Sequence, residues 1–191
     1  SYADEILTAT FGCGLDGFLR SHKSKLTGII NGIDSEHFTP SKDKLLEYPF
    51  TNLTEKKLNK KSYLKEKNLK GITKPLFIFI GRFTSQKGVD LLIDSLEEIA
   101  LNDCNIAILG DGEIQYQEKI KEIVDRYDNI HFEFKYNEVL SHQMYASADF
   151  LLMPSLFEPC GLNQMIAMSY GAIPIVHKVG GLKDTVHDYK L

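Results

Sequence analysis

From residue 75 onward, short apolar runs alternate with segments in which apolar residues recur every three or four positions. The short runs, rich in β-branched and aromatic residues, predict strands, and the longer periodicity predicts amphipathic helices. Strands alternating with helices are typical of a parallel sheet covered by helices. The pattern predicts five strands, over residues 76–81, 104–112, 129–135, 149–155 and 172–178.

Helices are predicted between these strands. Residues 88–100 place Leu91, Leu92, Leu96 and Ile99 on one face. Asn137 is predicted to cap a helix over residues 137–149, and Gly171 to end a helix over residues 161–171. A fourth helix is expected over residues 114–127. With right-handed crossovers, these elements predict an α/β fold built on a doubly wound, Rossmann-like parallel sheet.

The part of the chain before residue 75 has a different character. Residues 25–34 predict one more buried strand, followed by an Asn-Gly turn, in a different lobe. Eight lysines lie between Lys56 and Lys74. They predict a solvated linker or an exposed helix, with binding of a polyanion as the alternative. Both ends of the sequence fall inside predicted elements, so we expect it to be a piece of a longer chain.

Composition and charge narrow the class of protein. Of the 191 residues, 43% are hydrophobic, enough for one sizeable core, and the net charge of −4 carries no electrostatic footprint for nucleic acid. No apolar run approaches the ~20 residues of a membrane span. Three cysteines, an odd number without metal-ligand spacing, favour a reducing, cytoplasmic setting. The six histidines also lack such spacing, so we assign no metal site.

Candidate chemistry lies where the predicted strands end, because ligands of such sheets bind at the carboxyl ends of the strands. Arg82 and Lys87 follow the first strand. The planar guanidinium of an arginine and the compact ammonium of a lysine at one strand end suit the binding of a diphosphate. The alternative is an ordinary surface pair near the start of a helix.

Two weaker signals follow the second and third strands. Gly110 and Gly112 allow close approach of a ligand to the backbone, although an Asp-Gly sequence is equally an ordinary turn. Tyr136 precedes a helix, where its ring would stack on a base or pack as a half-buried tyrosine.

The segment after the fourth strand carries the densest set of candidates. Gly161, together with Pro159, is predicted to shape a bend that leaves the backbone N–H groups of Leu162 and Asn163 free to bind an anion. Glu158 is expected to accept hydrogen bonds from the hydroxyls of a sugar. Cys160 lies near the helix start, which favours a thiolate, but a packing role is at least as well supported.

Taken together, these loops resemble those of bacterial glycogen synthases and plant starch synthases. The similar stretches cover most of the chain in the family's order. They are FGCGLDGFLR (11–20), LTGIINGID (26–34), GRFTSQKGVDLL (81–92), LGDGE (109–113) and residues 141–186. The resemblance implies one lobe of the two-lobed GT-B fold and a retaining glucosyltransferase.

The resemblance also implies roles for individual positions. Arg82 and Lys87 would grip the donor diphosphate, Tyr136 would stack on adenine, and Glu158 would lie beside the donor glucose. Leu162 and Asn163 would form the backbone anion cradle, although Asn163 replaces the threonine that is commoner in the family. It further implies that residues 1–32 end an acceptor-side lobe, residues 33–74 connect the lobes, and residues 75–191 form the nucleotide-sugar-binding domain.

The parent enzyme would transfer glucose from ADP-glucose to the non-reducing end of an α-1,4-glucan, without a metal or other cofactor. Two alternatives stay open. One is a nucleotide-sugar-binding module without transfer activity, and the other is a glycosyltransferase of another pathway. Because acceptor-side residues are missing from this chain, we expect it to bind ADP weakly and to transfer no glucose by itself.

Overall fold

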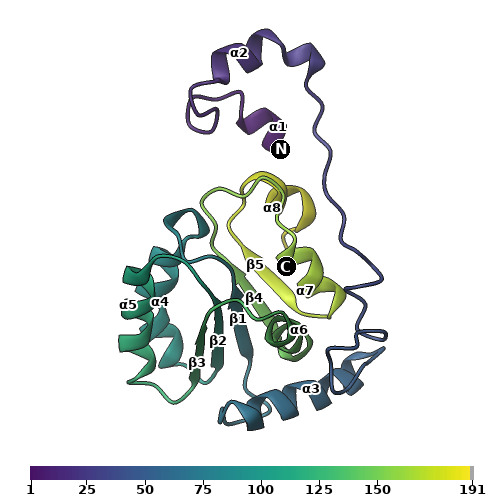
Figure 1. Cartoon of the computed structure of the whole chain (residues 1–191), viewed down its shortest axis with the longest axis vertical. Coiled ribbons are helices and arrows are strands. Elements are labelled where there is room, and N and C mark those ends of the chain that lie inside the picture. Colours follow the sequence, from purple (N-terminus) through teal and green to yellow (C-terminus); the bar gives the residue numbers. More distant parts are fainter. Residues whose placement is uncertain (190–191) are drawn as a thin grey trace.

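A five-stranded parallel sheet forms the centre of the computed structural model, which describes residues 1–189 (Figure 1). The strands are β1 (Leu76–Ile80), β2 (Asn105–Gly110), β3 (Ile130–Phe134), β4 (Phe150–Met153) and β5 (Ile173–Val176). Their order across the sheet is β3-β2-β1-β4-β5, with every neighbouring pair parallel. The five predicted strands are therefore confirmed, with ends that differ by a few residues.

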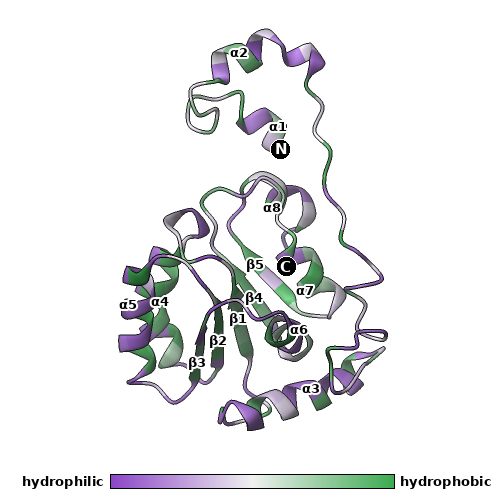
Figure 2. Ribbon diagram, in the orientation of Figure 1, coloured by the Kyte–Doolittle hydropathy of each residue, from purple (hydrophilic) through white to green (hydrophobic). Residues whose placement is uncertain are grey.

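Successive residues of the central strands point to opposite faces of the sheet, and each face has its own core. In β1, Ile78 and Ile80 join one buried cluster, whereas Phe79 joins the other. In Figure 2 the central strands β1 and β2 are coloured mostly as hydrophobic, as expected for strands buried on both faces. This pattern is why the apolar runs of the central strands are nearly continuous.

Helices cover both faces. The cluster that contains Phe79 is completed by α4 (Val89–Ala100) and α5 (Ile114–Val124). The opposite cluster is completed by α3 (Leu53–Glu66), α6 (Glu138–Ser147) and α7 (Asn163–Ser169), with α8 (Gly180–Thr185) after β5. Asn137 caps α6 as predicted, accepting a hydrogen bond from the Leu140 N–H, and Gly171 adopts the left-handed conformation after α7. The predicted doubly wound α/β fold is confirmed.

The lysine-rich region is a helix, one of the two forms predicted for it, but this helix is only partly exposed. It forms α3, which packs on α6, and the side chains of Lys56 and Lys60 are buried. The Lys56 ammonium donates to the Tyr170 carbonyl over 2.7 Å, and that of Lys60 donates to Asp149 over 2.6 Å. Solvation was the wrong expectation for these two lysines because the partners that satisfy them are distant in sequence.

The strand predicted within residues 25–34 is absent from the structure described for residues 1–189. These residues run in an extended path without a sheet partner, and the side chain of Ile29 is 88% exposed. A strand needs a neighbouring backbone to satisfy its N–H and C=O groups, and none of the described strands lies beside this segment. The apolar pattern was therefore insufficient evidence for a buried strand.

The segment before α3 is held to the sheet domain by a buried polar network. The Asp43 carboxylate accepts a hydrogen bond from the Tyr170 hydroxyl over 2.6 Å and lies 2.7 Å from His142 Nδ1. All three residues are buried. His142 thus ties this segment to α6, and residues that precede the predicted domain boundary at residue 75 contribute to the same core.

Residues 1–25 form a small helical segment beyond the carboxyl edge of the sheet (Figure 1). It contains α1 (Tyr2–Glu5), α2 (Asp16–Ser21) and the short η1 (Lys23–Lys25). Two aromatic side chains of this segment contact Phe157 of the sheet domain. The Phe11 ring stacks on the Phe157 ring with 5.7 Å between centroids, and the Tyr2 ring packs edge-on with 5.5 Å between centroids. No helix within residues 1–189 combines the length and apolarity that crossing a bilayer requires.

Candidate functional site

The sheet has a topological switch point between β1 and β4. From β1 the chain proceeds to β2 and β3 on one side, and β4 and β5 lie on the other side. In open α/β sheets, ligands bind outside the carboxyl ends of the strands at such a point. The loops that follow β1 and β4 are the loops that carry Arg82, Lys87 and Glu158.

These two loops are bound to each other. The Leu156 N–H donates to the Gln86 carbonyl over 2.9 Å, and the Gln86 side-chain amide donates to the Phe157 carbonyl over 3.1 Å. Gly88 has a positive φ of 67°, and a Cβ there would lie 2.1 Å from the Pro154 carbonyl oxygen. Only glycine allows this approach, which brings the end of η2 (Ser85–Lys87) against the β4 loop.

An ion pair joins the same loops. The Lys87 ammonium donates to Glu158 Oε2 over 2.5 Å, and the Ser155 hydroxyl donates to the same oxygen over 3.2 Å. The Glu158 side chain is only 8% exposed and that of Lys87 is 22% exposed. The pair is thus partly withdrawn from water, where electrostatic interactions are stronger than at an open surface.

The backbone of the Glu158 loop is supported by α8. The Gly181 N–H donates to the Glu158 carbonyl over 3.0 Å. A Cβ on Gly180 would lie 2.0 Å from that carbonyl oxygen, and one on Gly181 would lie 2.3 Å from the Cys160 Cα. The two glycines therefore allow direct backbone packing, which fixes the loop that holds Glu158.

Gln164 holds the bend that precedes α7. Its side chain is fully buried, and its Nε2 lies within hydrogen-bond distance of the carbonyls of Cys160 and Gly161 and of the Thr185 hydroxyl. Gly161 has a positive φ of 73°, as predicted for a residue that shapes the bend. A Cβ at Gly161 would also meet Gln164 Oε1 at 2.5 Å, so another residue would displace this support.

Cys160 lies between the Glu158 loop and the N-terminal segment. It lines a cavity of about 440 Å³ together with residues from α1 and from the extended segment 26–30. The side chain is half-buried, and the thiol is free. A molecule in this cavity would restrict access to the thiol, which makes Cys160 a useful reporter of occupancy.

Arg82 directly follows the loop residue after β1, and Asn163 begins α7 after β4. Arg82 is exposed. The Asn163 side-chain amide donates to the Ile80 carbonyl over 2.7 Å, so it is engaged in tying α7 to the end of β1. Leu162 precedes α7 as its N-cap without a side-chain cap. The anion cradle predicted from the backbone of Leu162 and Asn163 stays a prediction.

Gly110 and Gly112 have a packing reason within the protein. A Cβ on Gly110 would lie 1.9 Å from the Gly81 carbonyl oxygen, and one on Gly112 would lie 2.5 Å from that of Phe83. Gly112 also forms an isolated bridge with Phe83. The two glycines thus position the loop that carries Arg82, and their contact with a ligand stays a prediction.

Tyr136 follows β3 at the same edge of the sheet, with 59% of the residue exposed. The preceding residue, Lys135, donates its N–H to the Gly110 carbonyl over 2.8 Å. Tyr136 is therefore not the half-buried core tyrosine of the alternative, and its stacking on a base stays a prediction.

The structure brings together all the predicted strand-end loops and joins Lys87 directly to Glu158. Sequence reasoning missed the residues that support this arrangement, namely Gln86, Ser155, Phe157, Gln164 and His177, whose Nδ1 lies 3.0 Å from the Ser155 carbonyl oxygen. Gln164 was the one residue among these that the sequence could have singled out, because it is a polar residue within the apolar run of a predicted helix. Among the described residues, the trio of potential metal ligands includes neither Glu158 nor Cys160.

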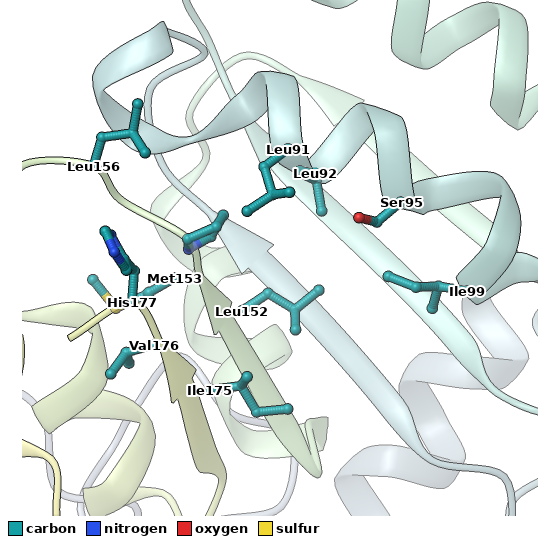
Figure 3. Close-up of a pocket in the computed structure, with 11 residues that line it drawn as sticks. Leu91, Leu92, Ser95, Ile99, Leu152, Met153, Leu156, Ile175, Val176 and His177 are labelled. Atoms are coloured by element: carbon teal, nitrogen blue, oxygen red, sulfur yellow. The ribbon is translucent and has the colours of Figure 1, made fainter.

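A separate groove of about 440 Å³ lies between α4 and the strands β4 and β5 (Figure 3). Ser95 and His177 are its polar lining residues, and leucine, isoleucine, valine, methionine and proline side chains form the rest. It lacks the cations that a diphosphate requires, so it does not compete with the switch point as the anion site.

Comparisons with known proteins agree with this geometry. The chain is 43% identical over 192 residues to the glycogen synthase of Thermodesulfovibrio yellowstonii, covering 98% of the chain and 39% of that protein. It is 45% identical over 193 residues to the glycogen synthase of Lacticaseibacillus casei, covering 99% of the chain and 40% of that protein. The chain therefore spans about two fifths of the length of these relatives.

The solved catalytic domain of starch synthase IV from Arabidopsis thaliana, bound to ADP and acarbose, is similar over 98% of this chain and 40% of its own. The TM-score is 0.93 at 38% identity, in agreement with the predicted GT-B lobe. The sequence profile of the family Glycosyl transferases group 1 matches residues 60–191. This match begins within α3 and includes every strand of the sheet. The chain therefore belongs to the group 1 glycosyl transferases.

Proposed function

We propose that this chain contributes the donor-binding part of a glycogen or starch synthase. The whole protein would transfer glucose from ADP-glucose to the non-reducing end of an α-1,4-glucan, with retention of configuration. Support comes from the relatives named glycogen synthase and from the starch synthase structure that holds ADP and acarbose. Glycogen biosynthesis would be its pathway, and a cytoplasmic location rests on the odd number of cysteines.

The observation that carries the proposal is the Lys87–Glu158 pair at the switch point between β1 and β4. It places a cation and a carboxylate side by side where such sheets bind ligands. A nucleotide sugar presents the matching groups, an anionic diphosphate and a ring of hydroxyls. A site for a simple anion would have no use for a buried carboxylate beside the cation.

Lys87 is able to bind Glu158 and a diphosphate at the same time because an ammonium has three N–H donors. One N–H is used by Glu158, and two are left for the oxygens of a diphosphate. Arg82, exposed at the end of β1, would add a planar fork to the same group. Together they would stabilise the negative charge that builds on the departing diphosphate, which is electrostatic catalysis by fixed cations.

Glu158 and the free ring of Tyr136 complete the proposed contacts. With Lys87 and Ser155 fixing Oε2, Glu158 Oε1 is left to accept a hydroxyl of the donor glucose. Tyr136 would stack on the adenine at the end of β3. In this arrangement the sugar lies over β4 and the base lies toward β2 and β3.

A titration by calorimetry tests the donor assignment. We expect the chain to bind ADP and ADP-glucose, more weakly than the whole protein does, and to bind UDP-glucose less well. Arg82→Ala should weaken ADP binding, whereas Arg126→Ala should not, because Arg126 follows α5 at the opposite edge of the sheet. Absence of any ADP binding, or equal loss in both variants, would refute the donor site.

Incorporation of labelled glucose into glycogen separates the alternatives. We expect transfer by the whole protein and none by this chain. Binding of ADP-glucose by a whole protein that transfers nothing would favour a nucleotide-sugar-binding module. Transfer from another nucleotide sugar would favour a glycosyltransferase of another pathway.

A further inference from the structure

The structure gathers two histidines and a glutamate at the start of α6, and none of them contacts Lys87 or Glu158 through a hydrogen bond or ion pair among the described residues. Glu138 and His142 are one turn apart on α6, and His37 comes from the segment that leads to α3. One ligand atom from each of the three residues lies within 4.8 Å of the other two. We propose that His37, Glu138 and His142 bind a divalent cation of the zinc class.

The distance between the two exposed members suits a tetrahedral centre. His37 Nε2 lies 3.3 Å from Glu138 Oε1. Two ligands that each lie ~2.0–2.1 Å from a tetrahedral zinc ion are separated by roughly 3.3–3.4 Å. Small rotations of the exposed His37 and Glu138 side chains would then complete the set around His142, the buried third ligand.

His142 is already oriented as metal-bound histidines usually are. Its Nδ1 lies 2.7 Å from Asp43 Oδ2, and both side chains are almost fully buried, at 1% and 2% exposure. An ionised Asp43 accepts the Nδ1–H, which leaves the lone pair on Nε2. A carboxylate that fixes the ring and tautomer of a histidine in this way is the usual outer-shell partner of a zinc ligand.

Asp43 is itself held in place. The Tyr170 hydroxyl donates to Asp43 Oδ2 over 2.6 Å, and Phe38 stacks on the His142 ring at 5.1 Å between centroids. A simple surface ion pair between His37 and Glu138 requires none of this support. The buried network therefore adds a preorganised third ligand to the exposed pair.

The donor set indicates the class of cation. Two imidazoles and one carboxylate suit zinc, whereas magnesium and calcium prefer oxygen ligands. A set of two histidines and one glutamate leaves the fourth position to water, as in open zinc sites. Because His37 and α6 belong to different segments, the ion would cross-link residues 34–43 to the helix that follows Tyr136.

Zinc affinity measured by competition with a fluorescent chelator tests this site. The variants are His37→Ala and Glu138→Gln, both at exposed side chains, so the fold should persist. Their matched controls are His22→Ala and Glu36→Gln, which remove an exposed histidine and an exposed glutamate outside the cluster. Cobalt binding, followed by visible absorption, reports the coordination geometry independently of any transfer activity.

We expect the unmodified chain to bind one equivalent of zinc and to give the intense cobalt spectrum of a four-coordinate site. Each cluster variant should lose roughly tenfold or more in affinity, the scale on which even outer-shell changes act, and each control should bind as the unmodified chain does. Absence of zinc binding, an octahedral cobalt spectrum, or equal losses in the controls and the cluster variants would overturn the proposal. Thermal unfolding of each apo variant shows that the fold is intact.

Discussion

The Lys87 ammonium and the Glu158 carboxylate lie 2.5 Å apart and join the loop after β1 to the loop after β4. The two residues are remote in sequence, yet the parallel pairing of β1 with β4 brings their loops to one edge of the sheet. Each residue thus has a partner within the protein before any ligand binds. Changes at this site are therefore expected to affect the stability of the chain and its affinity for ADP separately.

Lys87→Ala should lower the free energy of unfolding by about 2–4 kcal/mol, because it leaves the buried Glu158 carboxylate without its cation. Adding Glu158→Gln should recover part of this loss, since a neutral amide costs less to bury than an unpaired charge. Urea unfolding of the single and double variants measures both effects. Equal stability of Lys87→Ala and the unmodified chain would show that the pair contributes nothing.

Arg82→Ala should weaken ADP binding by roughly 1–3 kcal/mol, the scale of a charge-assisted hydrogen bond, and leave stability unchanged. The reason is that Arg82 is exposed and, within residues 1–189, its side chain makes no hydrogen bond or ion pair with the protein. Calorimetry and thermal unfolding on the same sample separate the two properties. A variant that binds ADP normally would remove Arg82 from the donor site.

Cys160 should be alkylated more slowly in the presence of ADP. The thiol lines the cavity beside the Glu158 loop, so a bound nucleotide would restrict the access of the alkylating reagent to it. Mass spectrometry of the labelled peptides measures the rate, and the exposed Cys13 serves as an internal control. Equal protection of both cysteines, or of neither, would contradict a bound nucleotide beside Cys160.

Tyr170→Phe should destabilise the chain by about 1.5–3 kcal/mol, because it removes a hydrogen bond from the buried Asp43 carboxylate. Tyr63→Phe is the matched control, since the Tyr63 hydroxyl is buried without a hydrogen-bond partner among residues 1–189. We expect that control to be neutral or slightly stabilising. Urea unfolding distinguishes the two, and equal losses would show that the network contributes no specific stability.

Lys56 should make stability rise with pH above about 8. Burial lowers the pKa of Lys56 from 10.5 to about 8, although the nearby Asp149 carboxylate acts in the opposite direction. Between these values the unfolded chain binds the additional proton, so deprotonation favours the folded chain. The gain in the free energy of unfolding is about 3.5 kcal/mol at most, at about 1.4 kcal/mol per pKa unit.

The difference between the unmodified chain and Lys56→Met isolates this effect from the other groups that titrate at high pH. Urea unfolding at intervals between pH 8 and 10.5 measures it. We expect the free energy of unfolding of Lys56→Met, minus that of the unmodified chain, to fall as the pH rises. A constant difference across this range would show that Lys56 keeps its ordinary pKa in the folded chain.

The sequence by itself determined the order of strands and helices after residue 75. Local properties suffice for this result, because burial on both faces makes the central strands continuously apolar and the helices have a distinct periodicity. The same pattern located the candidate residues, since Arg82, Lys87, Tyr136 and Glu158 all follow predicted strands. Positive φ values at Gly161 and Gly171 confirm the predicted turns because the lack of a Cβ is a property of the residue alone.

Only the tertiary structure decided which of these residues meet. Lys87 and Glu158 pair because β4 inserts next to β1, a choice that no local pattern contains. The burial of Lys56 depends on the Tyr170 carbonyl, and the placement of His142 depends on Asp43, both from distant parts of the chain. The apolar run at residues 25–34 predicted a buried strand but forms none, because a strand requires a partner and the described chain supplies none. Long-range contacts therefore set the charge environment of the site, which a one-dimensional pattern leaves open.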